Sequence, residues 1–226
     1  MKKIILLPLI FIIRLGISQP NANLKLWYDK PAGDTWENAL PIGNGRLGAM
    51  IYGNTNSETI QLNEHTVWSG SPNRNDNPES LIKLDSIRLL IFEKKYKEAE
   101  ALANRAIITK KSHGQKFQPV GNLHLVFDGH DKFTNYYREL NISRAVNITK
   151  YTVNNFTYTR ETFASLSDRI IIMKIAADKP GKISFNAYYR SPHLKKAMVT
   201  TSAQDLILSG ITSTHETAEG KIKFMT

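Results

Sequence analysis

The stretch that decides the fold runs from Val146 to Phe163 and reads VNITKYTVNNFTYTRETF. Two runs rich in β-branched and aromatic residues, Val146–Val153 and Phe156–Phe163, flank the pair Asn154-Asn155. Such runs are typical of strands, and asparagine tolerates the backbone angles of a tight turn. The stretch therefore predicts two neighbouring strands joined by a turn.

Similar strand-like runs, separated by turn residues, lie on both sides of this stretch. On the C-terminal side, turn residues separate the candidate strands Ile170–Ala176, Ile183–Tyr189 and Leu206–Ile211. On the N-terminal side, Arg46–Tyr52 and Thr59–Trp68 flank a Gly-Asn-Thr-Asn-Ser turn and predict a hairpin. Strands that recur without intervening helical periods favour antiparallel sheets stacked as a sandwich. We expect a mainly β protein.

A helical insert, at about residues 78–108, interrupts the β texture. Asn77, Pro78 and Glu79 predict an N-cap, a first-position proline and an acidic first turn. Apolar residues then mark two helical faces. The first face comprises Leu81, Leu84, Ile87, Leu90 and Ile91, and the second comprises Tyr96, Ala99, Leu102 and Ala106. The helical phase slips near Glu93–Lys95, which favours two helices or a kinked one.

Composition excludes several classes of protein. With 41% hydrophobic and 22% charged residues, the chain has enough apolar material for a core. The absence of cysteine excludes disulfides, thiolate metal sites and cysteine nucleophiles. The net charge of +10 resembles a nucleic-acid signal, but residues 79–116 alone hold nine basic against five acidic residues. Only Phe92 and Tyr96 accompany these cations, so we expect a solvated helical face and no nucleic-acid partner.

The first 18 residues predict an export signal. Lys2 and Lys3 precede the apolar run Ile4–Ile13, and small residues precede Gln19 as at a cleavage site. The run is too short to span a membrane. We therefore expect a periplasmic or extracellular protein, residues 19–226, with no membrane association after cleavage.

Several catalytic and cofactor motifs are missing from the sequence. The six histidines show no paired metal-binding spacing, and no P-loop or nucleophile elbow is present, so we predict no metal and no cofactor. Residues Gly43–Gly48 match the dinucleotide fingerprint literally, but they precede a predicted strand rather than a helix. We interpret these glycines as turn and close-packing positions.

Glu64 is the acid that calls for an explanation. If Thr59–Trp68 is one strand, alternation places Glu64 on the face of Ile60, Leu62 and Trp68. One interpretation is that Glu64, with Asn63 and Trp68, forms a polar wall of a sugar cleft. The alternative, which we weigh more heavily, is a structural carboxylate held by Arg46 or by loop amides.

Three ordered motifs carry a family resemblance. Residues Trp36–Met50, Ile60–Gly70 and Phe117–Leu123 resemble the N-terminal domain of glycoside hydrolase family 95, the α-L-fucosidase type. Shorter matches lie at Tyr137–Leu140, Tyr158–Glu161 and Ser191–His193. Asn122 stands where that family more usually has an acidic residue. The resemblance covers essentially the whole predicted mature chain.

The resemblance implies an enzyme larger than this chain. It implies an N-terminal antiparallel β-super-sandwich, a helical linker, an (α/α)6 catalytic barrel and a C-terminal β domain. It also implies inverting hydrolysis of terminal α-L-fucosyl or α-L-galactosyl linkages, with a fucosylated glycan as the substrate. None of the catalytic motifs lies in this chain. We therefore expect an N-terminal domain truncated before the barrel and incomplete at its C-terminus, inactive alone, which packs on the barrel.

The expected contribution to substrate binding is a cleft rim formed by Asn63, Glu64, Trp68 and Trp36, with no catalytic residue. An alternative from another class is a stand-alone carbohydrate-binding β-sandwich module. In that interpretation Trp27, Trp36 or Trp68 would be the stacking platform.

Overall fold

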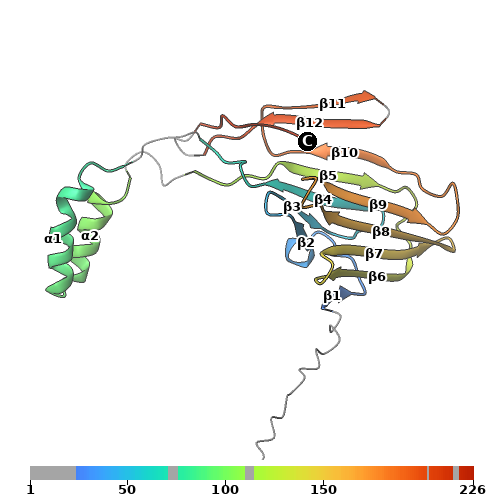
Figure 1. Ribbon diagram of the computed structural model, residues 1–226, viewed down its shortest axis with the longest axis horizontal. Coiled ribbons are helices and arrows are strands. Elements are labelled where there is room, and N and C mark those ends of the chain that lie inside the picture. The colour runs from blue at the N-terminus through green and yellow to red at the C-terminus, as the bar shows by residue number, and fades with distance from the viewer. Residues whose placement is uncertain (1–23, 71–75, 110–114, 203, 216–218) are drawn as a thin grey trace, which may run out of the picture.

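The computed structural model describes residues 24–70, 76–109, 115–202, 204–215 and 219–226. Antiparallel β-sheets dominate it, and two helices lie apart from the sheets (Figure 1). The predicted export segment, residues 1–18, lies outside the described residues. Within the described part of the chain, neither helix is long and apolar enough to cross a membrane.

The first sheet has five strands in the order β1-β6-β7-β8-β9. Its strands are β1 (Lys25–Tyr28), β6 (Thr134–Asn141), β7 (Val146–Val153), β8 (Phe156–Ala164) and β9 (Ile171–Ala177). The predicted pairing of the deciding stretch is confirmed, because Val153 lies opposite Phe156. Asn154 and Asn155 adopt φ angles of 51° and 65°, as a two-residue turn between twisted strands requires.

The second sheet has the order β10-β5-β4-β3-β2. Its strands are β2 (Leu40–Gly43), β3 (Leu47–Ile51), β4 (Ser57–Glu64), β5 (Gly121–Val126) and β10 (Asn186–Arg190). The predicted hairpin of β3 and β4 is confirmed by their antiparallel register. A short 3-10 helix, η1 (Trp36–Asn38), precedes β2.

The two five-stranded sheets pack face to face around one apolar core. Its buried cluster comprises Ile42, Ala49, Ile51, Ile60 and Leu125 of the second sheet and Phe127, which directly follows β5. The partly buried Leu140, Ile171, Met173 and Ile175 of the first sheet pack against this cluster. These side chains lie on alternate positions of their strands, as a half-buried sheet requires. The sandwich predicted from the sequence is therefore present.

A third sheet, with the order β11-β12-β13, lies beside β10 (Figure 1). Its strands are β11 (Lys196–Ser202), β12 (Asp205–Ile211) and β13 (Lys223–Met225). Leu208 packs with Val67 and Val120 in a second apolar cluster. This cluster attaches the third sheet to the sandwich.

The helical insert is a hairpin of α1 (Ser80–Phe92) and α2 (Tyr96–Ala106), so the predicted break near Glu93–Lys95 is confirmed. The Asn77 side chain accepts the backbone N–H of Glu79, as an N-cap does, and donates to the carbonyls of Arg105 and Ile108. Asn77 thus ties the start of α1 to the end of α2.

The expected apolar face of α1 is buried only in part. Ile87 is 7% exposed, whereas Leu81 and Phe92 are each 82% exposed. The helical hairpin therefore presents a large apolar surface that the described part of the chain leaves uncovered.

Two strand boundaries predicted from the sequence are wrong. The strand predicted at Thr59–Trp68 ends at Glu64, because His65 and Thr66 form a turn closed by the bond from Val67 N–H to the Glu64 carbonyl. The strand predicted from Ile183 begins at Asn186. In both cases the strand-like pattern of apolar residues in the sequence extends beyond the last hydrogen bond of the sheet, so the predicted strand is too long.

Candidate functional site

A cleft of about 800 Å³ lies on the outer face of the second sheet, the face away from the core. Its floor is a cross-strand row in which Met50, Gln61, Asn122 and Arg190 lie opposite one another on β3, β4, β5 and β10. Side chains directly opposite on neighbouring strands are close enough to contact one ligand together. The row therefore presents two amides, a thioether and a guanidinium to one space.

The glycine-rich segment leaves room in the floor of the cleft. Asn44 accepts the N–H groups of Arg46 and Leu47 through its side chain, and Gly45 adopts a φ of 85°. These contacts form a tight β2–β3 turn, so the interpretation as a turn position is confirmed for Gly45, whereas Gly43 and Gly48 lie in the strands. Gly48 lines the cleft, and a Cβ built on it would meet only the Ile42 carbonyl, at 3.8 Å.

Proline and tryptophan side chains form the walls. Trp36, from η1, is 54% exposed at one side, and Pro119 and Pro192 lie at the other. The buried His193 fixes this second wall, because its Nδ1 accepts the N–H of Ser213 and its Nε2 donates to the Pro119 carbonyl at 2.8 Å. This pattern requires the neutral imidazole with its proton on Nε2.

Gly121 is needed where the wall meets the floor. A Cβ at this position would lie 2.6 Å from the Arg190 carbonyl, and its φ is 153°. The Ser191 hydroxyl donates to the Val120 carbonyl at 2.8 Å and holds the neighbouring segment in place. The residues around Gly121 and Ser191 thus hold β5 and β10 close together next to the cleft.

The structure brings two of the four predicted rim residues together. Trp36 and Asn63 both line the cleft. The Asn63 side-chain oxygen accepts the backbone N–H of Glu64 at 3.0 Å, which turns its amide N–H groups toward other partners. An indole face next to amide groups suits a sugar ring, which has apolar faces and hydroxyl edges.

Glu64 lies apart from this cleft, on the opposite face of β4, where a smaller cavity between the sheets opens. Its carboxylate contacts Arg46 Nε at 3.0 Å and accepts the N–H of Thr66 at 2.8 Å. Burial alone would raise the pKa of Glu64, but the bonds from Thr66 and the nearby His65 and Arg46 lower it overall. These are the contacts expected if Glu64 is a structural carboxylate held by Arg46 and by loop amides. A contact between Glu64 and sugar stays a prediction.

Trp68 does not share a strand face with Glu64, because β4 has already ended. Its indole N–H donates to the His65 carbonyl at 2.7 Å, and its ring packs on Phe117 with 5.1 Å between centroids. Trp68 therefore closes the turn that leads out of β4, and it does not line the cleft of Trp36 and Asn63.

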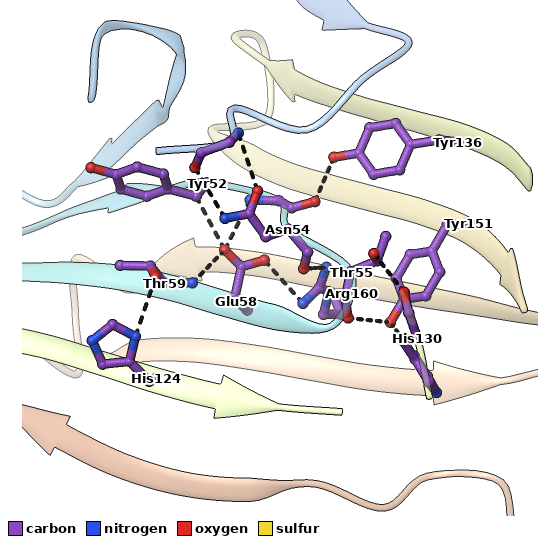
Figure 2. Close-up of polar contacts among 12 residues, drawn as sticks. Tyr52, Asn54, Thr55, Glu58, Thr59, His124, His130, Tyr136, Tyr151 and Arg160 are labelled. Carbon is purple, nitrogen blue, oxygen red and sulfur yellow. Dashed lines mark hydrogen bonds and ion pairs between the residues drawn. The ribbon is translucent and has the colours of Figure 1, made fainter. Parts of the chain in front are cut away.

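A second polar cluster lies between the sheets, around the fully buried pair Glu58 and Arg160 (Figure 2). One Glu58 oxygen accepts the N–H groups of Tyr52 and Gly53, and the other lies 3.0 Å from Arg160 Nη1. Arg160 also donates to the Asn54 carbonyl at 2.6 Å. Because both charges are enclosed, this cluster holds a loop against the first sheet and offers no access to a ligand.

The sequence analysis missed the polar cluster around Glu58 and most of the residues that form the floor of the cleft. Glu58 directly follows the predicted Gly53–Ser57 turn in the sequence, whereas the structure places it in β4, inside the sandwich. Gln61 and Arg190 were not assigned to a site, and Asn122 was noted only as a family departure. Period-two alternation along β4 was the available signal, since it places Gln61 and Asn63 on the face opposite Ile60 and Leu62.

The described lining of the cleft offers amides, an indole and a guanidinium. No aspartate or glutamate is among its lining residues, as far as the structure describes the chain. Glycoside hydrolysis by the usual route needs two carboxyl groups on either side of the scissile bond. The cleft as formed by these residues can therefore hold a polyhydroxylated ligand, but it supplies neither an acid nor a base.

Comparison with known proteins gives a consistent result. The family described as "Glycosyl hydrolase family 65, N-terminal domain" matches residues 26–226. The Arabidopsis thaliana protein named "Alpha-L-fucosidase 2" is 37% identical over 190 residues, which cover 83% of this chain and 22% of the relative. The Aspergillus oryzae "Probable alpha-fucosidase A" is 28% identical over 73% of this chain and 23% of its own length. The chain thus spans less than a quarter of these relatives.

Proposed function

The chain belongs to the family of glycosyl hydrolase family 65 N-terminal domains, and from this premise we propose that it serves an α-L-fucosidase-like enzyme as its glycan-binding front domain. The relatives named as fucosidases support this class of substrate. The observation that carries the proposal is the cleft of Trp36, Gln61, Asn63 and Asn122, which offers an indole and three amides without a carboxylate.

The finer proposal follows the sequence motifs. In it, the intact enzyme is of the family 95 type and hydrolyses terminal α-L-fucosyl or α-L-galactosyl linkages with inversion on a helical barrel outside this chain. This domain supports the barrel and contributes Trp36 and Asn63 to the rim of the substrate cleft. The uncovered apolar side chains of Leu81 and Phe92 on α1 support packing against a further domain, because a helix that is apolar on several sides is normally covered.

Export belongs to the same proposal. The apolar run Ile4–Ile13 behind Lys2 and Lys3 supports cleavage after Ser18 and a periplasmic or extracellular location. Intact-mass analysis of the expressed protein tests this directly. A mature N-terminus at Gln19 is expected, and retention of Met1 in exported material would contradict it.

A second candidate function is a stand-alone carbohydrate-binding module. It is favoured by the exposed Trp27, which stacks on Tyr137 with 6.3 Å between ring centroids on the outer face of the first sheet. Two parallel rings on a sheet face form a platform on which a sugar can stack. This platform lies on a different sheet from the cleft, so the two functions can be separated by mapping.

The experiment is an NMR titration of the isotope-labelled chain with L-fucose. Our proposal predicts that the shifted amide signals belong to the outer face of β4 and β5, at Gln61, Asn63 and Asn122. Shifts confined to Trp27 and Tyr137 would instead favour the binding module. The chain alone should leave an aryl α-L-fucoside intact, and turnover by this chain would contradict its assignment as a noncatalytic domain.

A further inference from the structure

Arg190 stands at the far end of the cleft from Trp36. Four strand intervals separate β2, which follows Trp36, from β10, and at a spacing of roughly 4.8 Å they span about 19 Å. A single sugar ring is much shorter than this distance. A sugar that stacks on Trp36 therefore leaves the Arg190 end of the cleft free for another ring or substituent of the same glycan.

Among the residues that the structure describes, the guanidinium of Arg190 has no anionic partner. No carboxylate of a described residue forms an ion pair with it, and no acid lines the cleft. Its side chain lies over the ring of Tyr188, with 5.5 Å from the guanidinium carbon to the ring centroid. Stacking on an aromatic ring limits the conformations of an arginine without using its N–H donors.

The surroundings of Arg190 provide further hydrogen-bond donors. Asn122 lies directly opposite it on β5, and Gln61 follows on β4. His124 stacks on Tyr188 with 4.9 Å between centroids, and burial together with the Arg190 charge lowers the pKa of His124. The imidazole is therefore neutral near pH 7, and among the described residues that line the cleft only Arg190 is charged.

From this juxtaposition we infer that the cleft binds a glycan bearing an anionic group, with the carboxylate or sulfate paired to Arg190 and flanked by the amides of Asn122 and Gln61. A planar guanidinium pairs with such oxyanions through two N–H donors. The inference rests on the proposed function, since it names the substrate class of the same cleft. The shared chemistry is an oxyanion on a sugar, from either a uronic acid or a sulfate ester.

The test uses matched pairs of sugars in calorimetric titrations of the chain at low ionic strength. D-galacturonate is compared with D-galactose, and L-fucose 4-sulfate with L-fucose. We expect at least one anionic sugar to bind about tenfold more tightly than its neutral parent, as charge-assisted pairing allows. The pair that shows the difference identifies the source of the oxyanion. Added salt should reduce this advantage.

Arg190→Gln is the diagnostic variant, and Lys150→Gln, on the exposed face of β7, is the matched control. Arg190→Gln should abolish the affinity advantage of the anionic sugar over its neutral parent while it preserves the melting temperature. Equal affinity of each anionic sugar and its parent, or an advantage that survives in Arg190→Gln, would overturn the inference. If L-fucose binds without any anionic preference, only the inference fails. If no sugar binds, the proposed cleft fails with it.

Discussion

At the level of single residues, the buried pair Glu58 and Arg160 holds the loop before β4 in place. Glu58 accepts backbone N–H groups of the loop before β4, and Arg160 reaches from β8 to the same loop. Burial raises the pKa of Glu58, while Arg160 and the N–H donors oppose that rise. The ionised form therefore depends on keeping every partner.

Arg160→Met should destabilise the protein by about 3 kcal/mol or more, because it leaves the Glu58 carboxylate buried without its cation. Urea denaturation gives the free energy of unfolding. The double variant Glu58→Gln with Arg160→Met should lose less than the single variant, since no charge remains buried. Lys174→Met on the exposed side of β9 is the control and should stay within about 0.5 kcal/mol. A loss of under about 1 kcal/mol in Arg160→Met would show that the pair is not structural.

The buried His130 should make stability depend on pH. Burial, and then the Arg160 charge, lower the pKa of His130, whose Nδ1 lies 3.0 Å from the Tyr151 hydroxyl. The unfolded chain takes up a proton below about pH 6.5, whereas the folded chain does so only at lower pH. Stability should therefore fall as the pH drops from 7 toward the folded-state pKa.

Thermal melts between pH 7 and pH 5 measure this effect. His124, whose pKa is also lowered, contributes in the same direction. His130→Gln should flatten the profile in part, and the double variant His124→Gln with His130→Gln should flatten it further. A slope that is identical in the wild type and the double variant would contradict the assignment.

Among the secondary-structure elements, the sequence predicts those whose turns and apolar periodicity lie within one short segment. The hairpins β3–β4 and β7–β8 and the two helices follow from asparagines, glycines and apolar periodicity that lie within one segment. β6 and β11 were not identified as strands, because polar residues interrupt their alternation, as in the run Thr134–Asn141. β5 was also missed, although Leu123 and Leu125 alternate there with Asn122 and His124.

The cleft could not be predicted for a related physical reason. Gln61, Asn122 and Arg190 are far apart in the sequence, and only the register of β4, β5 and β10 places them in one row. Asn63 and Trp36 were proposed together, and the structure brings them together. Trp68 was placed on the face of Glu64 because the strand was extended past the turn at His65 and Thr66. Asn63 and Glu64 are consecutive residues of β4, so they lie on opposite faces of the strand.

The helical hairpin should depend on Asn77 without affecting the sandwich. Asn77→Ala removes one cap bond and two bonds to the carbonyls of Arg105 and Ile108, at 3.0 and 2.9 Å. A lost cap costs roughly 1 kcal/mol, and the lost carbonyl bonds add to it. Hydrogen exchange measured by mass spectrometry should speed up in α1 and α2 and stay unchanged in β7 and β8. Equal acceleration in both regions would mean that the hairpin and the sandwich unfold as one unit.

For the molecule as a whole, two features support the proposed function. The sandwich builds a cleft that lacks carboxylates, while the hairpin leaves Leu81 and Phe92 uncovered. Both features fit a domain that presents a glycan to chemistry carried out elsewhere, in line with relatives that are four to five times longer than the aligned region. A domain of this kind is expected to bind sugar while it shows no turnover.

Gly48 allows the most direct test of this claim. Its Cβ position faces open space in the cleft, so Gly48→Leu should fill the floor beside Asn63, whereas Gly48→Ala should be tolerated. The measurement is a calorimetric titration of the wild type and both variants with L-fucose, with melting temperatures as the folding control. We predict that the wild type and Gly48→Ala bind and that a folded Gly48→Leu does not. Equal binding by Gly48→Leu and the wild type would contradict the account.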